Sequence, residues 1–468
     1  MSRSNIVYLP ESICDLQNLE TLKLKHCNQL RKLPKRMRYM RNLVYLDIKG
    51  CHSLISMPPK LGQLTSLRRL SIFIVGQAEG YRIGELKELN LAGELEMKIL
   101  DNVRSPADAE NANLKRKHDL VSLNLSWDYH KEENLPSDVE GVLESLQPHS
   151  NLKKLRCEQL PPLGKLHVLK ILNITGMRSV KCFDPECYGD GEISFQALEI
   201  LDLLDMRSLE EWTTMDRQDV FPRLQVLSLW GSPKLTNLPA LPTLESWQIH
   251  GSEMLLESVN NLTSLSSLSI GDFQLEILPH GLFQNHEALE SLMIQSMPNI
   301  ETLQNQMSGL SSLKRLKLNC CRKIGNLTGL EILNSLDSLD IMGCDSLTDL
   351  KGLEGLTSLR SLYIRHCLKL RSLSEGMQHL TLLRDLHISG CPEIQSFPEG
   401  MRNLNSLQRM AISDCEGLIT LPNWLGNLQS LSYLEIRRCS NLRSRCKKES
   451  GEDWLKIAHI PNIWIKDD

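Results

Sequence analysis

The sequence predicts a repetitive α/β solenoid with a parallel β-sheet, and three observations lead to that prediction. The chain of 468 residues is 41% hydrophobic but only 5% aromatic, so its core must consist almost entirely of aliphatic side chains. Leucines supply most of these side chains, and they recur in one motif about every 24 residues along nearly the whole chain. Within each copy, two apolar residues lie on either side of a single outward residue, which is the periodicity of a β-strand.

The motif is clearest in the last third of the chain, where it reads L-x-x-L-x-L/I-x-x-C-x-x-L/I. There the register advances by 23, 24, 24 and 24 residues, with copies that begin at Leu336, Leu359, Leu383, Leu407 and Leu431. Further copies begin at Leu19, Leu43, Leu67, Leu120, Leu152, Leu169, Leu198, Leu224, Leu244, Leu265, Leu289 and Leu313, and a degenerate copy lies near Leu95. About 17 to 18 repeats therefore cover the chain.

A single repeat cannot bury its own leucines, so neighbouring repeats must stack on one another. Many copies end in an apolar residue followed by proline, as in Leu33-Pro34, Phe397-Pro398 and Leu421-Pro422. Proline there keeps the chain from continuing as a strand or helix and turns it into the outer layer. We therefore expect a leucine-rich-repeat horseshoe, with the parallel sheet on its concave face.

The regularity of the motif divides the chain into four parts. Residues 1–75 and 169–450 are expected to form regular leucine-rich repeats, residues 76–168 irregular repeats with helical insertions, and residues 451–468 a C-terminal tail or cap.

Two helices are expected within the irregular part. The first has Ser105 as its N-cap and Pro106 at its first position, and it is predicted to run to about Lys117. The second opens with a capping box over residues 137–140 and ends before Pro148.

Eight of the fourteen cysteines occupy one position of the repeat, which we call the cysteine slot; they are Cys27, Cys51, Cys321, Cys344, Cys367, Cys391, Cys415 and Cys439. In other copies this slot contains Met177, Met206, Met297, Ser232 or Ser252. Because the slot accepts methionine and serine as well, it selects a small or adaptable side chain rather than a disulfide partner. We expect buried free thiols, as in a reducing compartment.

Charge and hydropathy exclude several classes of protein. With 53 Lys+Arg against 57 Asp+Glu, the net charge of -4 argues against a nucleic-acid partner. No apolar stretch approaches the roughly 20 residues of a transmembrane helix, so no membrane span is expected. The first residues have no apolar segment typical of a signal peptide. These features favour a cytoplasmic or nuclear location.

No motif with catalytic or cofactor chemistry is found. Gly164-Lys165 lacks the upstream glycine of a phosphate-binding loop, and His286 has no second histidine four residues later. Cys182 and Cys187 form a single pair without the second pair that a structural zinc site needs. The chain is therefore not expected to be an enzyme, and neither a metal nor another cofactor is expected.

If the leucines point inward, the residues between them must cover the concave face. Their chemistry varies from copy to copy while the inward positions stay nearly constant, which favours recognition of a protein on this face. The candidate binding residues are Lys23, Lys25, Lys49, Trp230, His250, Lys317, Tyr363, Arg365, His387 and Arg437.

A basic cluster lies near the N-terminal end and contains Arg31, Lys32, Lys35, Arg36, Arg38 and Arg41. Runs of like charge are usually solvated surface. The alternative is docking to an acidic surface of another domain, and the candidate docking residues are then Arg36, Arg38 and Arg41.

The repeat form, with blocks such as LPESICDLQNL from Leu9 to Leu19, resembles the repeat domain of plant nucleotide-binding leucine-rich-repeat (NB-LRR) disease resistance proteins. The segment that starts with IGELKELNLAGEL at Ile83 is similar to the irregular block of their coiled-coil class. Residues 451–461, GEDWLKIAHIP, are similar to the C-terminus of that class.

The resemblance implies a role in plant innate immunity. It implies that the repeats sense pathogen effectors or their modified host targets, and that they restrain a nucleotide-binding switch module in cis or in trans. Such receptors place a coiled coil and this module before the repeats, and neither fits before Leu9. The resemblance therefore implies a receptor truncated at its N-terminus.

Two other protein classes remain as alternatives. The chain fits a free-standing cytosolic leucine-rich-repeat adaptor or scaffold. It fits less well the substrate-recognition arm of a ubiquitin ligase, which needs an F-box-like helical segment upstream.

Overall fold

The computed structural model describes residues 2–127, 139–157, 166, 168–177, 180–184, 195–213 and 220–466. The chain forms two compact units. Unit 1 comprises Met1–Ser228 with Leu238–Thr243, and unit 2 comprises Leu229–Asn237 with Leu244–Asp468. The sequence boundary between them falls within β12 (Val226–Trp230).

Unit 1 is built on parallel strands. The first three form one sheet, in the order β1 (Thr21–Lys23), β2 (Tyr45–Asp47) and β3 (Arg69–Leu70). Six more pair in the order β4 (Ile72–Ile74), β5 (Gly93–Lys98), β6 (Leu120–Leu125), β7 (Lys154–Cys157), β8 (Ile171–Thr175) and β10 (Ile200–Leu204). A separate parallel pair consists of β9 (Cys182–Phe183) and β11 (Glu211–Trp212).

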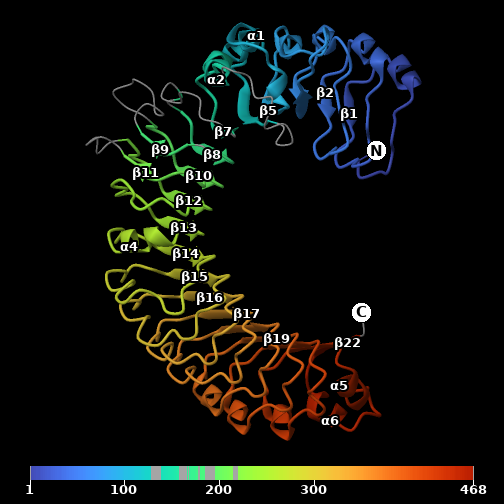
Figure 1. Ribbon diagram of the computed structural model, residues 1–468. Helices are drawn as coiled ribbons and strands as arrows, with labels where there is room; N and C mark the ends of the chain where they lie inside the picture. The colour runs from blue at the N-terminus through green and yellow to red at the C-terminus, as the bar shows by residue number, and fades with distance from the viewer. Residues whose placement is uncertain are drawn as a thin grey trace. The chain divides into compact units, whose positions relative to one another are not determined.

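Unit 2 is a regular stack of parallel strands, which Figure 1 shows side by side from β13 to β22. They are β13 (Ser246–His250), β14 (Ser267–Gly271), β15 (Ser291–Gln295), β16 (Arg315–Asn319), β17 (Ser338–Met342), β18 (Ser361–Arg365), β19 (Asp385–Ser389), β20 (Arg409–Ser413), β21 (Tyr433–Arg437) and β22 (Asn462–Lys466). Equivalent positions of the motif pair directly, so that Leu339 lies opposite Leu362 and Ile341 opposite Ile364. The predicted solenoid with a parallel sheet is confirmed.

Short helices form the layer opposite the strands. The 3₁₀ helices are η1 (Glu11–Asp15), η2 (Lys35–Tyr39), η3 (Leu61–Gln63), η4 (Ile83–Leu86), η5 (Leu100–Asn102), η6 (Leu114–Arg116), η8 (Glu253–Leu255), η9 (Glu375–His379), η10 (Glu399–Asn403) and η11 (Asn423–Asn427). Pro34, Pro398 and Pro422 directly precede η2, η10 and η11, as the position of proline in the motif predicts. The fixed φ of proline starts each turn away from the strand.

Among the described residues, the α-helices are α1 (Pro106–Glu110), α2 (Val139–Leu146), α4 (Leu256–Val259), α5 (Ser440–Arg445) and α6 (Trp454–Ile457). Ser105 caps α1 as predicted, and its hydroxyl accepts a hydrogen bond of 3.3 Å from the backbone N–H of Asp108. The prediction that this helix reaches Lys117 is wrong. Asn113 adopts a left-handed conformation with φ 51°, which asparagine tolerates and which ends helical geometry.

Lys117, the predicted end of this helix, lies beyond it and makes buried hydrogen bonds. Its side chain is buried, and its Nζ donates hydrogen bonds of 2.7 Å to the carbonyls of Leu86 and Leu89. Burial lowers the pKa of this ammonium group to about 8. Lys117 thus connects the segment after α1 to the end of η4.

The second predicted helix is α2, which ends at Leu146, before Pro148 as predicted. Residues 137 and 138 of its expected capping box lie outside the described residues.

The eight cysteines of the slot are buried thiols, as predicted. Several of these thiols also donate a hydrogen bond to a backbone carbonyl at the end of a strand. The Sγ of Cys415 lies 3.2 Å from the carbonyl oxygen of Ser413, and the Sγ of Cys439 lies 3.3 Å from that of Arg437. Burial raises the pKa of the Cys321 thiol to about 11, so this thiol stays protonated at neutral pH.

The residue directly after each of five consecutive strands has a positive φ; these are Gly343, His366, Gly390, Asp414 and Arg438. The chain turns there, and the side chains of His366 and Arg438 are exposed. Gly390 is needed next to His366, because a Cβ atom at Gly390 would lie only 2.4 Å from the Nδ1 of His366.

The C-terminal end contains a strand that the sequence analysis missed. Residues 451–468 were expected to form a tail or cap, yet β22 pairs with β21 and continues the sheet. The alternation of Ile463 and Ile465 around Trp464 is a strand pattern that could have indicated it.

Asp453 holds this end in place. Its carboxylate is buried, and it accepts hydrogen bonds from the Leu421 backbone N–H at 3.0 Å and from the Thr420 hydroxyl at 3.0 Å. It also pairs with Arg445 at 3.1 Å and with Lys456 at 2.8 Å. Burial raises the pKa of the Asp453 carboxyl, but these hydrogen bonds outweigh burial and hold the pKa well below its usual range.

We predict that Asp453→Asn lowers the free energy of unfolding by about 2–3 kcal/mol, because it leaves buried donors and cations without their partner. Since the folded pKa of Asp453 is depressed, its contribution is present above the unfolded pKa and is lost as the pH falls below about 4. Urea denaturation at several pH values measures both effects. The matched control is Glu452→Gln, whose exposed carboxylate also pairs with Arg445 and should contribute less than about 1 kcal/mol. Equal losses in the two variants would contradict this account.

His286 occupies a position where neighbouring repeats have a leucine. Leu262, Leu310, Leu333 and Leu356 are the equivalent residues, and all of these side chains are buried. His286 is fully buried as well, and neither ring nitrogen makes a well-formed hydrogen bond. Burial lowers the pKa of the imidazole, although the nearby carbonyl of Val259 acts in the opposite direction.

We predict that His286→Leu stabilises the chain by about 1–2 kcal/mol, because it removes a buried polar ring that lacks partners. The sign of the pH dependence follows from the lowered pKa. Below about pH 6.5 the unfolded chain binds a proton that the folded chain does not, so stability of the native chain falls. Thermal melting at pH 5.5 and 7.5 should therefore show a larger gain for His286→Leu at the lower pH. A gain that does not depend on pH would contradict the assigned role of the buried ring.

Candidate functional site

The outward side chains of the unit 2 strands form a continuous face, which we call the sheet face. Each strand from β15 to β20 buries its second and fourth residues and leaves the other three wholly or partly accessible. Because the strands pair without a shift, the middle residues form one row across the sheet. From β16 to β21 this row contains Lys317, Asp340, Tyr363, His387, Ala411 and Glu435.

The centre of this row is an aromatic cluster, which we call the Tyr363 platform. The rings of Tyr363 and His387 stack with their centroids 5.0 Å apart. The guanidinium of Arg365 lies 5.3 Å from the Tyr363 ring centroid, and it pairs with Asp340 at 3.4 Å. Lys317 approaches the same carboxylate at 4.0 Å. The structure therefore brings four predicted residues together, and two of them, Lys317 and Arg365, meet at Asp340, which the sequence analysis did not single out.

Charged pairs surround the platform on the neighbouring strands. Arg409 forms an ion pair with Asp385, while Arg437 forms one with Glu435. Glu435 also accepts a hydrogen bond of 2.8 Å from the Tyr433 hydroxyl. Burial lowers the pKa of His387, although Asp385 and Glu435 act in the opposite direction. The platform is thus an aromatic surface bordered by paired charges.

His250 was expected to be exposed, and this expectation is wrong. Only 1% of the residue is accessible, because the Trp230 ring lies over it with the two ring centroids 4.0 Å apart. The imidazole lies 3.1 Å from the Ser269 hydroxyl and 3.4 Å from the Asp272 carboxylate. Gly271 provides the space, since a Cβ atom there would lie 2.9 Å from the His250 Nδ1. Trp230 remains 38% exposed, so it is the accessible member of this pair.

The three lysines predicted in the first repeats are exposed on the strand side of unit 1. Lys23 lies on β1 with its Nζ 5.7 Å from the Tyr45 ring centroid. Lys49 pairs with Glu94 at 3.1 Å, and Lys25 is exposed as expected.

Three residues of the basic cluster, Lys35, Arg36 and Arg38, lie on η2 in the layer opposite the strands of unit 1, and the others lie just before or after this helix. Part of its charge is already compensated within the chain. Arg36 pairs with Asp15 of η1 at 3.2 Å, and its backbone N–H donates to Glu11. Arg38 donates to the Tyr39 hydroxyl at 2.8 Å. The side chain of Arg41 is exposed.

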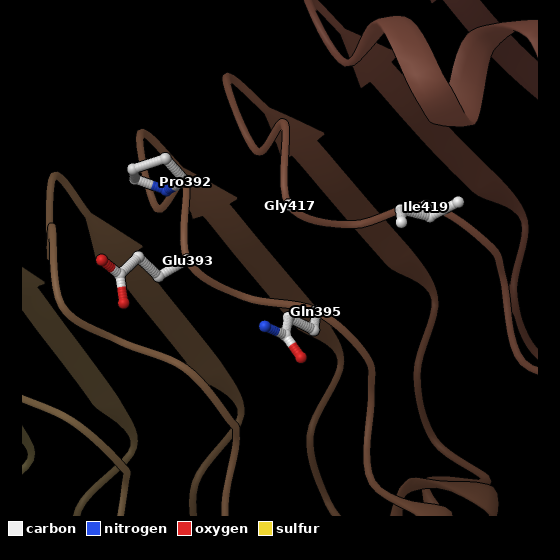
Figure 2. Close-up of a pocket in the computed structure, with 5 residues that line it drawn as sticks. All are labelled: Pro392, Glu393, Gln395, Gly417 and Ile419. Carbon is white, nitrogen blue, oxygen red and sulfur yellow. The ribbon is translucent and has the colours of Figure 1, made fainter.

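A hollow of about 510 Å³ lies beside β19 and β20, lined by Pro392, Glu393, Gln395, Gly417 and Ile419 (Figure 2). Its one carboxylate, Glu393, pairs with Arg371 at 2.9 Å.

Among the described residues, no group of three or more His, Cys, Asp or Glu side chains is arranged to bind a metal ion. Of the cysteine pair considered as a zinc site, Cys182 is exposed on β9 and Cys187 lies outside the described residues. The Gly164-Lys165 dipeptide also lies outside them.

In the part of the chain that the structure describes, no helix is long and apolar enough to cross a membrane.

The irregular repeats match a known family of repeats. A family model described as R13L1/DRL21 LRRs matches residues 83–158. This range includes η4, α1 and most of the segment in which the 24-residue register fails.

Three relatives named as disease resistance proteins are similar over larger parts of the chain. RGA2 of Solanum bulbocastanum is 37% identical over 316 residues, which are 62% of this chain and 32% of RGA2. RGA1 of the same species is 32% identical over 53% of this chain and 28% of its own length. The protein At3g14460 of Arabidopsis thaliana is 36% identical over 50% of this chain and 20% of its own length. The chain thus spans about a third or less of the length of these relatives.

A solved structure with the same fold is the Toll–Spätzle complex of Drosophila, with a TM-score of 0.53 and 18% sequence identity. The match covers 75% of this chain and 47% of that one. At this identity the likeness concerns the fold alone. Together, the relatives and the repeat family confirm the resemblance to leucine-rich repeats of plant disease resistance proteins.

Proposed function

We propose that the chain recognises proteins in plant defence, because its repeats are similar to those of plant disease resistance proteins. In this proposal the sheet face senses a pathogen effector or a host protein that an effector has modified. The recognition takes place in the cytoplasm or nucleus, and it requires neither a cofactor nor catalysis.

The observation that carries this proposal is the Tyr363 platform. Its stacked rings offer a large rigid surface, and tyrosine and arginine are the residue types that contribute most to binding energy at protein interfaces. The surrounding ion pairs are fixed before a partner arrives, so little conformational entropy is lost when one binds. A face needed only for stability would not require these side chains, because the inward leucines alone provide the core.

We further propose that the N-terminal basic cluster contacts the nucleotide-binding module and helps to restrain it. Arg36, Arg38 and Arg41 lie on one short segment around η2. An acidic surface of the module would compete with Asp15 for the guanidinium of Arg36, so that binding and release remain reversible. The exposed Arg41 offers a charge on the same surface.

We predict that Tyr363→Ala weakens binding of a recognised effector by about 2 kcal/mol, or roughly thirtyfold, because it removes the centre of the platform. Effectors that co-precipitate with the chain are first identified, and their affinities are then measured by calorimetry. The matched control is Tyr8→Ala, which removes an exposed tyrosine far along the chain from the sheet face. If Tyr363→Ala and Tyr8→Ala bind with equal affinity, recognition takes place elsewhere.

We predict that reversing the charge of Arg36, Arg38 and Arg41 to glutamate weakens docking of a nucleotide-binding module supplied in trans by roughly tenfold at low salt. Co-precipitation and surface plasmon resonance measure this loss. The control reverses three exposed residues outside the cluster, Lys87, Lys115 and Arg116. Unchanged affinity of the cluster variant at low salt would count against docking through η2.

A further inference from the structure

The strands from β16 to β20 lie side by side in unit 2 (Figure 1) and form the centre of the sheet face. Counted with the residue that directly precedes each of them, these strands carry seven cations and three carboxylates. The cations are Lys314, Arg315, Lys317, Arg360, Arg365, Arg384 and Arg409, and the carboxylates are Asp337, Asp340 and Asp385. This part of the sheet face and its edge are therefore cationic, although the whole chain has a net charge of -4.

Acidic residues around these strands do not cancel the excess. Glu435 on β21 pairs with Arg437 of the same strand. Asp467 and Asp468 follow β22, two strands beyond β20, and lie outside the described residues. The turns directly after β16 to β20 contain as many cations as carboxylates, namely Arg322, Lys323, Lys369 and Arg371 against Asp345, Glu393, Asp414 and Glu416.

The two carboxylates in the middle of the face are covered by the cations that pair with them. Asp340 pairs with Lys317 and Arg365, and Asp385 pairs with Arg409. Only 18% of the Asp340 side chain and 14% of the Asp385 side chain are accessible, against 38% for Arg365 and 62% for Arg409. A partner that approaches this face therefore meets mainly cationic groups.

The carboxylates at the edge of the face are paired as well. Asp337 is about as exposed as Arg360, with which it pairs at 3.4 Å. Glu290, which precedes β15, pairs with Lys314 at 2.6 Å. The hydrogen bond from Lys314 is the main cause that lowers the pKa of Glu290, and the charge of the exposed Arg315 adds to it. Even with Glu290 counted, the cations outnumber the carboxylates.

We propose that the sheet face from β16 to β20 binds an acidic segment of its partner protein. This inference rests on the proposed function, since it names the chemistry of the partner that the face recognises. Carboxylates of the segment pair with the exposed cations, while an aromatic or aliphatic side chain packs on the Tyr363 platform. Ser338 and Ser361 are short and half-buried, so they leave room for that side chain beside Tyr363.

A nucleic acid and a second copy of the chain fit this surface less well. The regularly spaced phosphates of a nucleic acid would also meet the carboxylates of Asp340 and Asp385, whereas a protein segment can place neutral residues there. Two copies that faced each other through this surface would bring like charges together.

The test measures fluorescence anisotropy of labelled peptides with the full chain at low salt. The probe has about eight residues, enough in extended form to cross these strands at their spacing of about 4.8 Å, with glutamates on both sides of a central phenylalanine. In two further peptides lysine or glutamine replaces every glutamate. The native chain is expected to bind the glutamate peptide at least about tenfold more tightly than either of these, and the difference should shrink as salt is added.

Charge reversal on the face provides the second measurement. Arg315→Glu/Arg384→Glu is expected to weaken binding of the glutamate peptide at least roughly tenfold, because like charges then face each other. Neither arginine belongs to the ion pairs described above, so no carboxylate loses its partner. Arg315→Gln/Arg384→Gln should cause a smaller loss, with circular dichroism showing that each variant folds.

The matched control is Lys351→Glu/Arg402→Glu, which makes the same change in net charge at two exposed residues that lie on no strand. This variant is expected to bind the glutamate peptide like the native chain. Equal losses in the two charge-reversed variants, equal binding of the glutamate and lysine peptides, or no binding of the glutamate peptide would each overturn the proposal. So would a single-stranded RNA that binds this face more tightly than the glutamate peptide and loses affinity with Arg315→Glu/Arg384→Glu.

An effector that binds the chain separates this inference from the proposed function. If the effector loses affinity with Tyr363→Ala but not with Arg315→Glu/Arg384→Glu, the acidic partner is overturned and recognition on the sheet face stands. If neither variant changes its affinity, the proposed function fails and this inference fails with it. Losses in both variants support the acidic partner.

Discussion

The structure depends on one constraint, which is that every repeat shares its apolar side chains with its neighbours. A strand of five residues with two inward side chains cannot exclude water alone. In unit 2 the inward residues of successive strands lie directly opposite one another, as Leu362 and Leu386 do, and both are fully buried. Stacking therefore demands the same residue types at the same positions in each copy. It demands nothing of the residues between them, so these positions are free to acquire chemistry.

This separation explains how far the sequence could predict the molecule. Positions under the constraint were predictable, and the strands, the proline-led turns and the buried cysteines were found from their spacing. Errors occurred where a single local exception decides the outcome. His250 lies on the outward side of β13, but Gly271 on the next strand leaves room for its ring to fold under Trp230. Asn113 ends a helix that the preceding residues favour.

Contacts within the candidate site were harder to foresee than its members. Counting residues from each leucine placed Tyr363 and His387 on the sheet face, and the direct pairing of β18 with β19 stacks their rings. The role of Asp340 could not be predicted from its own strand. Its carboxylate contacts Arg365 and Lys317, which lie on the two neighbouring strands. Such partnerships join residues that are more than twenty positions apart in sequence, so composition and local motifs do not reveal them.

The central claim is that outward residues on β17 to β20 recognise a protein while the inward residues only maintain the fold. Hydrogen exchange followed by mass spectrometry, with and without a bound effector, tests this claim most directly. The account predicts that the effector slows exchange in β17 to β20 and leaves the 3₁₀ helices of the opposite layer unchanged. Protection confined to η9, η10 and η11, with no change in these strands, would contradict it.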